Sequence, residues 1–423
     1  MATSGPTGAF ELAQRVGRAV ARTPGLGVLW APPRAAGFAI GALVKERFGT
    51  ADPDLPRTRP SLALTAQVAL DEALLGVMRN PRRYPTDSEL HAVAVDVHDA
   101  VAVYEREGWL HDPSGFHQDP PPLTDVTRSM GWAMGMWYER LSWPSGYATP
   151  RELPGHERWE SYARNRIAYA YLVRSAPERP WLVCIHGFGT GVPMSDFFAF
   201  RARKLAEELK LNLAFTVLPL HGPRRASRLS GAELLSYNLL DFVYGMGQAV
   251  WDLRQLIRWL KAEGATKVGF YGMSLGSYAG ALLAGLEPGI DLGIAGVPLC
   301  DMARMIDHHA TSKMRARARE HGIGFEPLSR LYSVISPLAW PSLVPSERTF
   351  MYAGVGDRMS TPGQAARLWH HWGEPKILWY EGSHLTFLWS GRVSRFLEES
   401  LADAGWIDAK ATNLPSSNGS ARR

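Results

Sequence analysis

The chain has 423 residues, of which 46% are hydrophobic and 21% charged, a composition that fits a globular protein with one large domain and an appendage. Its 46 basic and 41 acidic side chains leave a net charge of +5 that is spread along the sequence. This small excess, without a zinc-finger, RRM or KH motif, argues against a nucleic-acid-binding protein.

Both cysteines, Cys184 and Cys300, lie in or just after apolar runs, and we interpret them as reduced, buried thiols. Residues 1–25 lack the apolar stretch and cleavage site of a signal peptide. The apolar run 35–44 is shorter than the roughly 20 residues that a membrane-spanning helix needs. Residues 11–22 set three apolar residues against three arginines, so an interfacial membrane helix is one interpretation, although we favour docking on the protein's own core. The sequence predicts a soluble, cytoplasmic protein.

The first part of the chain, residues 1–130, has helical patterns. Apolar residues at helical spacing predict one helix over residues 61–80. A further helix is expected to begin at a cap formed by Asp87 or Ser88 and to stop at Gly108. We therefore expect an N-terminal helical region.

After the proline cluster at residues 119–125, short β-rich runs alternate with helices, so we place a second domain over residues 131–405 and a disordered tail over 406–423. The strand runs are almost continuously apolar, as expected where helices cover both faces of a parallel sheet. The predicted fold class is α/β, with an open, doubly wound, mostly parallel sheet. The seven expected strands are residues 167–173, 181–185, 213–218, 267–271, 293–297, 349–353 and 376–380.

The motif GMSLG at residues 272–276 places Ser274 between two glycines, directly after an expected strand and before an expected helix. Such a strained turn needs neighbours without side chains on both flanks. The motif alone is compatible with a nucleophilic serine and with an ordinary turn residue. Its surroundings favour the nucleophile.

A second strand runs into the glycine-rich loop HGFG, which begins at His186. Loops of this kind aim backbone N–H groups at the oxyanion that forms when a serine attacks a carbonyl. We expect the oxyanion hole to be formed by the amide of Leu275, which follows the nucleophile, and by Phe188 and Gly189 of this loop.

Two further expected strands end in residues that complete a catalytic triad with Ser274. GVGDRM delivers Asp357 and EGSH delivers His384. His384 would take the serine proton, and Asp357 would orient the imidazole. Asp301, after the strand ending near residue 297, is an alternative acid that we rank second.

With HGFG, GMSLG, GVGDRM and GSH each at the end of an expected strand, residues 145–400 resemble the α/β-hydrolase superfamily. The resemblance implies a Ser–His–Asp hydrolase with a mostly parallel sheet and a small cap inserted after the sixth strand, here about residues 301–340. The N-terminal helical region is not common to that superfamily. The order of the HGFG strand, the LPLHGPRR loop and a long helix also faintly resembles a lipid-deacylating branch.

Several residues beside the motifs are candidate substrate contacts. Arg224 and Arg225 follow an expected strand and could hold an anionic group, although we favour solvated arginines paired with nearby acids. His186 and Met273 adjoin the oxyanion loop and the nucleophile. The histidine pairs at 308–309 and 370–371 lack a metal-binding spacing, so no metal is expected.

We therefore predict a serine esterase that cleaves a carboxylic ester, with a lipid-like ester as one substrate class, through an acyl-Ser274 intermediate. No cofactor is expected, and the partner is a small-molecule ester rather than a nucleic acid. A peptidase or an acyltransferase on the same triad, and a non-catalytic binding module with this fold, remain open alternatives.

Overall fold

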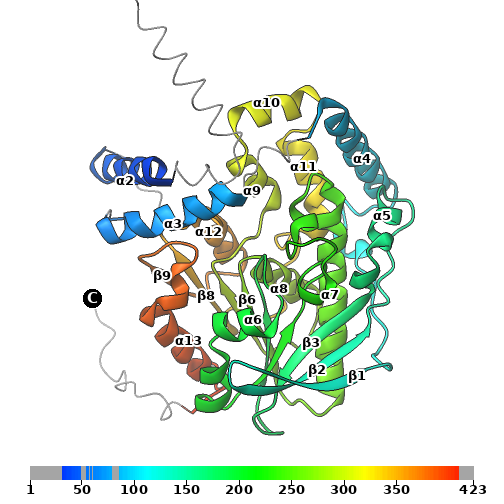
Figure 1. The fold of residues 1–423 in the computed structure, drawn as a ribbon, viewed down its shortest axis with the longest axis vertical. Helices are drawn as coiled ribbons and strands as arrows, with labels where there is room; N and C mark the ends of the chain where they lie inside the picture. Colours follow the sequence, from blue (N-terminus) through cyan, green and yellow to red (C-terminus); the bar gives the residue numbers. More distant parts are fainter. Residues whose placement is uncertain (1–30, 49–53, 57, 60, 79–84, 409–423) are drawn as a thin grey trace, which may run out of the picture.

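A computed structural model of the chain describes residues 31–48, 54–56, 58–59, 61–78 and 85–408. The described part is built around one nine-stranded sheet with the order β1-β2-β3-β5-β4-β6-β7-β8-β9 (Figure 1). The strands from β5 through β9 pair in parallel, and β1, β2 and β3 join antiparallel at one end. The strands are β1 (Thr127–Ala133), β2 (Met136–Pro144), β3 (Ile167–Val173), β4 (Trp181–Ile185), β5 (Asn212–Thr216), β6 (Val268–Met273), β7 (Leu292–Gly296), β8 (Thr349–Gly354) and β9 (Lys376–Tyr380).

All seven strands predicted from the sequence are present, β3 through β9, with ends that differ by at most two residues. The hairpin of β1 and β2 was not predicted. Its two-residue turn is Met134–Gly135, where both residues have positive φ angles of 52° and 77°, the geometry that tight hairpins prefer.

The helices cover both faces of the sheet, so the predicted doubly wound arrangement is confirmed. α7, α8 and α12 pack on one face, and α6 and α13 pack on the other. Cys184 and Cys300 are free and buried, as expected. The helices of the described part are α2 (Ala31–Phe48), α3 (Leu62–Met78), α4 (Asp87–Arg106), α5 (His156–Ser161), α6 (Pro193–Ala199), α7 (Leu239–Ala262), α8 (Leu275–Leu286), α9 (Met302–His309), α10 (Ser312–Glu320), α11 (Phe325–Tyr332), α12 (Pro362–His371) and α13 (Gly391–Asp403).

Helices α3 and α4 confirm the two helices predicted near the N-terminus. The cap of α4 is Thr86 rather than Asp87 or Ser88, because Thr86 and Glu89 form a reciprocal capping box, with Thr86 N donating to Glu89 Oε2 at 2.6 Å. α4 contributes buried side chains to the core on the α7 face of the sheet. Residues 11–22 lie outside the described ranges.

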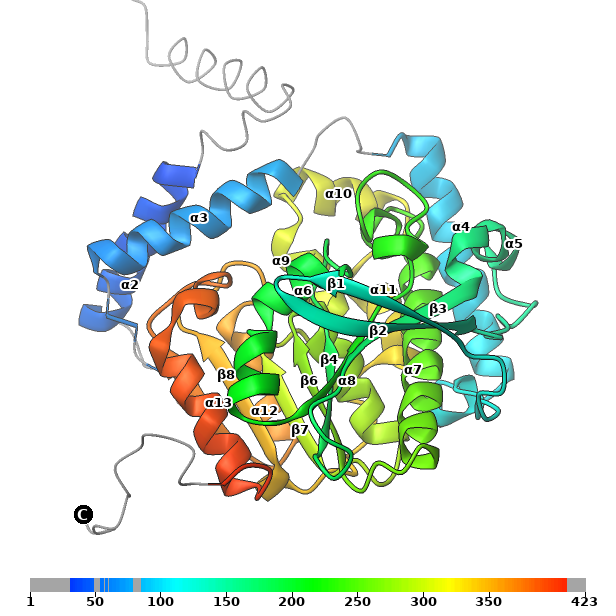
Figure 2. The same cartoon turned by 60° about the horizontal axis from the view of Figure 1, so that its bottom comes forward.

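Three helices, α9 to α11, form the insertion between β7 and β8 where a cap was expected (Figure 2). Trp406 and Ile407, placed in the tail by the sequence analysis, are buried, whereas 409–423 lie outside the described residues. No helix in the described ranges combines the length and apolarity needed to cross a bilayer. The mostly parallel sheet, its two helical layers and the turn at Ser274 together form an α/β-hydrolase fold.

Candidate active site

Ser274 occupies a strained turn between β6 and α8. Its φ of 54° and ψ of −116° lie in a region that residues with a side chain rarely adopt. The turn is held in place by Ser274 N, which donates to the Gly296 carbonyl at 2.9 Å. This geometry raises the serine side chain at the carboxyl end of the strand, as a nucleophile elbow does.

The glycines flanking Ser274 are sterically required, as the sequence indicated. A Cβ on Gly272 would overlap the carbonyl oxygen of Gly276 and lie 2.8 Å from Ser277 Cα. A Cβ on Gly276 would overlap the carbonyl oxygen of Ile185 and lie 2.7 Å from that of His186. Both obstacles are backbone atoms, so neither can swing away. Position 276 therefore has to be a glycine for α8 to pack this closely on the end of β4.

The structure brings Ser274, His384 and Asp357 together from the ends of β6, β9 and β8. His384 Nε2 lies 3.1 Å from Ser274 Oγ, and His384 Nδ1 lies 2.7 Å from Asp357 Oδ2. The second carboxylate oxygen of Asp357 accepts hydrogen bonds from the amides of Met359 and Ser360 at 2.8 and 2.9 Å. Because the carboxylate only accepts, Nδ1 carries the proton, and Nε2 is left free to accept one from Ser274.

The charge state of His384 is set by its neighbours. Its side chain is buried, and burial by itself lowers the pKa of an imidazole. The Asp357 carboxylate outweighs burial through its charge and its hydrogen bond, with a further contribution from Asp71, so the pKa of His384 is raised above its ordinary value of 6.5.

Asp301, the alternative acid, has a different role. Its carboxylate caps α9 by accepting from the Arg304 amide at 3.0 Å, and it forms an ion pair with Arg304 Nε at 3.1 Å. It makes no hydrogen bond to His384, whose Nδ1 is taken by Asp357. Asp357 is therefore the carboxylate that orients His384, and the alternative is wrong.

The expected oxyanion loop lies against the serine. A Cβ on Gly187 would be 3.5 Å from Ser274 Cβ, and Gly189 turns the chain with a φ of +84°. Leu275 is the first residue of α8, a position whose amide has no partner within the helix. In the described part of the chain, the amides of Leu275, Phe188 and Gly189 donate to no other residue. Their role as oxyanion donors stays a prediction.

Two proteins of Mycobacterium tuberculosis match most of this chain, and no family model matches it. Uncharacterized protein MT2702 of strain CDC 1551 / Oshkosh is 38% identical over 378 residues, which cover 89% of this chain and 91% of that protein. Uncharacterized protein Rv2627c of strain ATCC 25618 / H37Rv is 37% identical with the same coverage. The chain belongs to their family.

Solved structures are more distantly similar to this chain. Acetyl xylan esterase 1 from Thermoanaerobacterium sp. is 14% identical with a TM-score of 0.48, covering 70% of this chain and 92% of that one. An acetyl xylan esterase from Paenibacillus sp. R4 is 15% identical with a TM-score of 0.46, covering 72% and 94%. Both TM-scores lie below 0.5, and it is the strand order and the elbow at Ser274 that define the fold of this chain.

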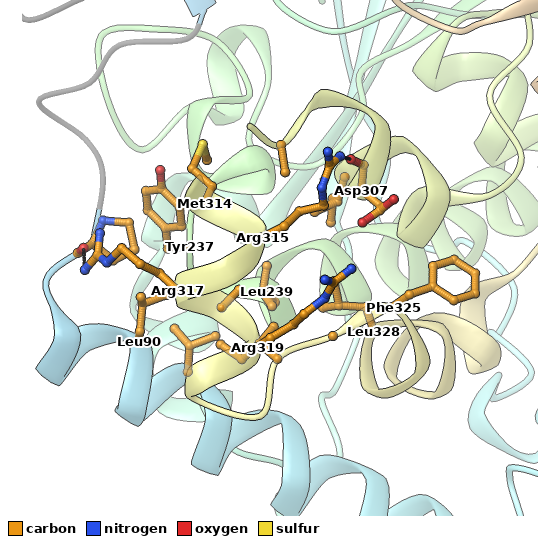
Figure 3. A pocket seen from close by; sticks show the side chains of 17 residues that line it. Leu90, Tyr237, Leu239, Asp307, Met314, Arg315, Arg317, Arg319, Phe325 and Leu328 are labelled. Carbon is orange, nitrogen blue, oxygen red and sulfur yellow. Dashed lines mark hydrogen bonds between the residues drawn. The ribbon is translucent and has the colours of Figure 1, made fainter. Parts of the chain in front are cut away.

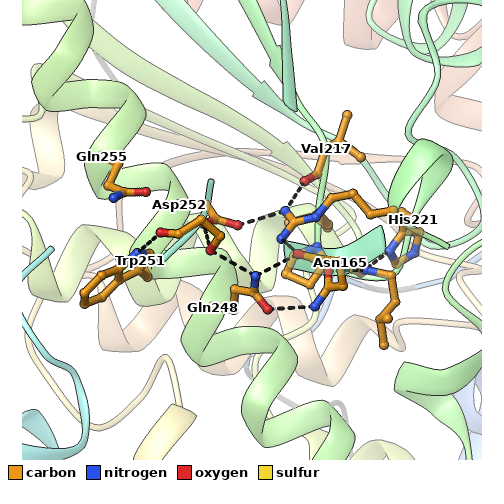
Figure 4. Close-up of polar contacts among 12 residues, drawn as sticks. Asn165, Val217, His221, Gln248, Trp251, Asp252 and Gln255 are labelled. Carbon is orange, nitrogen blue, oxygen red and sulfur yellow. Dashed lines mark hydrogen bonds and ion pairs between the residues drawn. The ribbon is translucent and has the colours of Figure 1, made fainter. Parts of the chain in front are cut away.

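Arg224, a candidate substrate contact for which the sequence favoured a solvated arginine paired with an acid, is fully buried. Its Nη1 donates to Asp252 Oδ2 at 2.8 Å and to the Val217 carbonyl at 2.9 Å, and its Nη2 donates to the Asn165 carbonyl at 2.9 Å (Figure 4). Both Nη atoms are held by the protein's own carboxylate and carbonyl groups, and the Nε is buried without a partner, so the guanidinium presents no donor to a ligand at the surface. The substrate-contact candidate is wrong for Arg224. The favoured interpretation was right about an acidic partner, Asp252, and wrong about exposure to solvent, because Arg224 connects the loop after β5 to α7 inside the protein.

His186 and Met273 are also structural. His186 Nε2 accepts from the Leu218 amide at 3.1 Å and Nδ1 donates to the Gly187 carbonyl at 2.7 Å, so both ring nitrogens are occupied. Burial lowers the pKa of His186 to about 4, which keeps the ring neutral. Met273 is buried in the core on the α6 face of the sheet. Neither side chain is presented to substrate, whereas Arg225 is exposed and stays a candidate.

Asp71 is a residue of the site that the sequence analysis did not single out. It lies on α3, is fully buried, and its Oδ2 accepts from the amide of His384 at 2.8 Å and from that of Arg358 at 3.1 Å. A signal was present in the sequence, because Asp71 and Glu72 are the charged residues of an otherwise uncharged helix. Charges at such positions are rarely buried without a partner.

An apolar pocket of about 130 Å³ lies between α4 and the cap helices α9 to α11 (Figure 3). Among the side chains that line it are Leu90, Leu239, Met314, Ile323 and Leu328. None of the residues that line it belongs to the triad or to the oxyanion loop.

The histidine pairs show no metal-binding arrangement. His309 Nε2 lies 3.0 Å from the Met359 carbonyl, and His370 Nδ1 lies 3.1 Å from Glu374. Within the described residues, no group of three or more His, Cys, Asp or Glu side chains is placed to hold a metal ion.

Proposed function

We propose that the protein is a serine hydrolase that cleaves a carboxylic ester through an acyl-Ser274 intermediate. The observation that carries the proposal is the unbroken line of contacts from Ser274 Oγ through His384 to Asp357, at 3.1 and 2.7 Å, with the serine on a strained elbow. Backbone strain of this kind is retained where it serves a function. A binding module has no need of it.

In the proposed reaction, Ser274 Oγ attacks the ester carbonyl carbon while its proton passes to His384 Nε2. The oxyanion of the tetrahedral intermediate faces the amides of Leu275, Phe188 and Gly189. Cleavage of the ester C–O bond releases the alcohol, which takes the proton from Nε2 and leaves acyl-Ser274. Water then attacks the acyl carbon and gives its proton to Nε2. That proton returns to Oγ as the acid leaves.

The apolar pocket supports a substrate with an apolar part. Most of its lining surface is apolar, although Asp307 and three arginines also border it, and filling it would remove apolar surface from water. An acyl chain long enough to reach from Ser274 to this pocket would make the substrate a lipid-like ester. A peptidase or an acyltransferase would share the acyl-enzyme and differ in the leaving group or acceptor.

A fluorophosphonate probe tests the proposal on the full-length protein. We expect wild-type protein to be labelled at one site and to hydrolyse p-nitrophenyl esters of increasing acyl length, because the activated Oγ attacks phosphorus and carbonyl carbon alike. Ser274→Ala should lose both activities. Ser227→Ala, which changes an exposed serine in the loop after β5, serves as the control. Folded wild-type protein that never labels would favour the non-catalytic module, and labelling that survives in Ser274→Ala would point to another nucleophile.

The pH dependence of the reaction gives an independent prediction. Only neutral His384 accepts the serine proton, so kcat/KM should be lost as the pH falls through the raised pKa of this residue, above 6.5. Asp357→Asn removes the largest stabilising charge, so it should move this acid limb to lower pH and lower kcat/KM by roughly 10⁴-fold. A pH profile of ester hydrolysis checks both effects, and an acid limb that does not move would show that Asp357 does not control His384.

A further inference from the structure

We propose that Asp71 is a positioning residue for the catalytic machinery, contributed by the N-terminal helix α3; the proposal rests on the hydrolase function proposed above. One carboxylate oxygen, Asp71 Oδ2, accepts from the backbone amides of both His384 and Arg358, at 2.8 and 3.1 Å. Arg358 directly follows Asp357. A single atom therefore joins the loop that carries the base to the loop that carries the acid.

Helix α3 is fixed to these loops by packing as well as by Asp71. Leu64 and Val68 form a small core with Val355, which precedes the acid by two residues. A Cβ on Gly356 would lie 2.8 Å from Leu64 Cδ1 and 3.1 Å from Val68 Cγ2, so the helix sits directly on the loop backbone. α3 accordingly lies beside the loops after β8 and β9 in both views (Figure 1, Figure 2).

An ion pair forms a second connection between α3 and Arg358. Glu72 Oε1 accepts from Arg358 Nε at 3.0 Å, and the Glu72 side chain is only 3% exposed. Asp71 therefore holds the Arg358 backbone while the next residue on the helix holds the Arg358 side chain. Hydrogen bonds in which the donor or the acceptor is ionised are stronger than those between neutral groups.

The charge of Asp71 acts on His384 in addition to its hydrogen bonds. The nearby charged or titratable groups are His384, Asp357, Arg358, Glu72 and Tyr380. Burial, followed by the Asp357 charge, raises the pKa of Asp71, whereas His384 and the two amides act to lower it. In its ionised form Asp71 favours the protonated imidazole and so adds to the raised pKa of His384. Removing its charge should shift the acid limb to lower pH.

Two substitutions distinguish the hydrogen bonds of Asp71 from the effect of its charge. Asparagine keeps an oxygen acceptor and loses the charge, whereas alanine loses both. We expect Asp71→Ala to lower kcat by roughly 10- to 100-fold with little change in KM, since small displacements of catalytic groups are costly. Asp71→Asn should restore most of kcat at alkaline pH and retain the shifted acid limb. Leu70→Ala, on the exposed side of the same helix at 43% exposure, should behave as wild type.

The experiment measures kcat, KM, the pH profile, the fluorophosphonate labelling rate and the melting temperature of the four full-length proteins. If Asp71→Ala melts earlier but keeps the wild-type kcat and acid limb, Asp71 is only structural and the proposal is overturned. The same holds if Asp71→Asn loses as much kcat as Asp71→Ala with an unshifted acid limb. Wild-type protein that does not label overturns the hydrolase function itself, so the two failures are distinguishable.

Discussion

Replacement of His384 by alanine is expected to lower kcat/KM by about 10⁴- to 10⁶-fold, the range seen when a triad base is removed. Without the imidazole, Ser274 Oγ keeps its proton, and a neutral serine hydroxyl is a weak nucleophile. The elbow itself should stay folded, because its strain is held by the Gly296 carbonyl and by the packing of Gly272 and Gly276. Ester hydrolysis and the fluorophosphonate labelling rate measure the effect.

His98→Ala is a matched control for this substitution. The His98 side chain on α4 is 83% exposed, so its loss should change neither activity nor melting temperature. Since Asp357 Oδ1 keeps its two amide donors without His384, the loss of activity should not be accompanied by unfolding. If His384→Ala keeps more than a tenth of the wild-type turnover, His384 is not the general base and the proposed mechanism is wrong.

The parallel part of the sheet could be predicted because strands buried on both faces are continuous apolar runs. β4 and β6 are buried at every position, and their sequences are accordingly such runs. Ser274 and Asp357 could be located because each follows such a run, and His384 because it follows the apolar run of the edge strand β9, which is only partly buried. The carboxyl ends of these parallel strands meet at one edge of the sheet.

The β1–β2 hairpin could not be predicted in the same way because it lies at the end of the sheet, where one face is partly uncovered. Met130, Trp132 and Trp137 are exposed at 66%, 61% and 67%, so apolar residues do not mark the buried side. The burial along β2 does not alternate regularly either. The hairpin therefore shows neither of the two patterns that identify strands, a regular alternation of apolar and polar residues or a continuous apolar run.

Arg224 and Asp71 show why buried charges are the hardest part of a site to predict. Their partners lie far away in sequence, with Asp252 28 residues from Arg224 and His384 313 residues from Asp71. A charged residue in a loop or on a helix is usually solvated, and only tertiary contacts reveal the exceptions. Arg224 was thereby expected in solvent or at a ligand rather than in the core, and Asp71 was overlooked.

Replacement of Gly276 by alanine should have the second large effect, on stability as well as activity. The added Cβ would overlap the Ile185 carbonyl oxygen and lie 2.7 Å from that of His186, and both belong to the end of β4 and the oxyanion loop. Overpacking against backbone should lower the free energy of unfolding by about 3 kcal/mol. Chemical denaturation measures this loss, and labelling of Ser274 should slow because α8 and the oxyanion loop are pushed apart.

Gly391→Ala separates this steric effect from a general cost of replacing glycine. Gly391 is the first residue of α13, a Cβ there meets nothing within 4 Å, and its φ is not in the left-handed range. Alanine should therefore be neutral or slightly stabilising at this position, since it restricts the unfolded chain. If Gly276→Ala unfolds at the same denaturant concentration as Gly391→Ala and labels at the wild-type rate, α8 does not pack against β4 through position 276. Other contacts would then hold the oxyanion loop beside Ser274, and the two buried hydrogen bonds of the His186 ring would be the first to test.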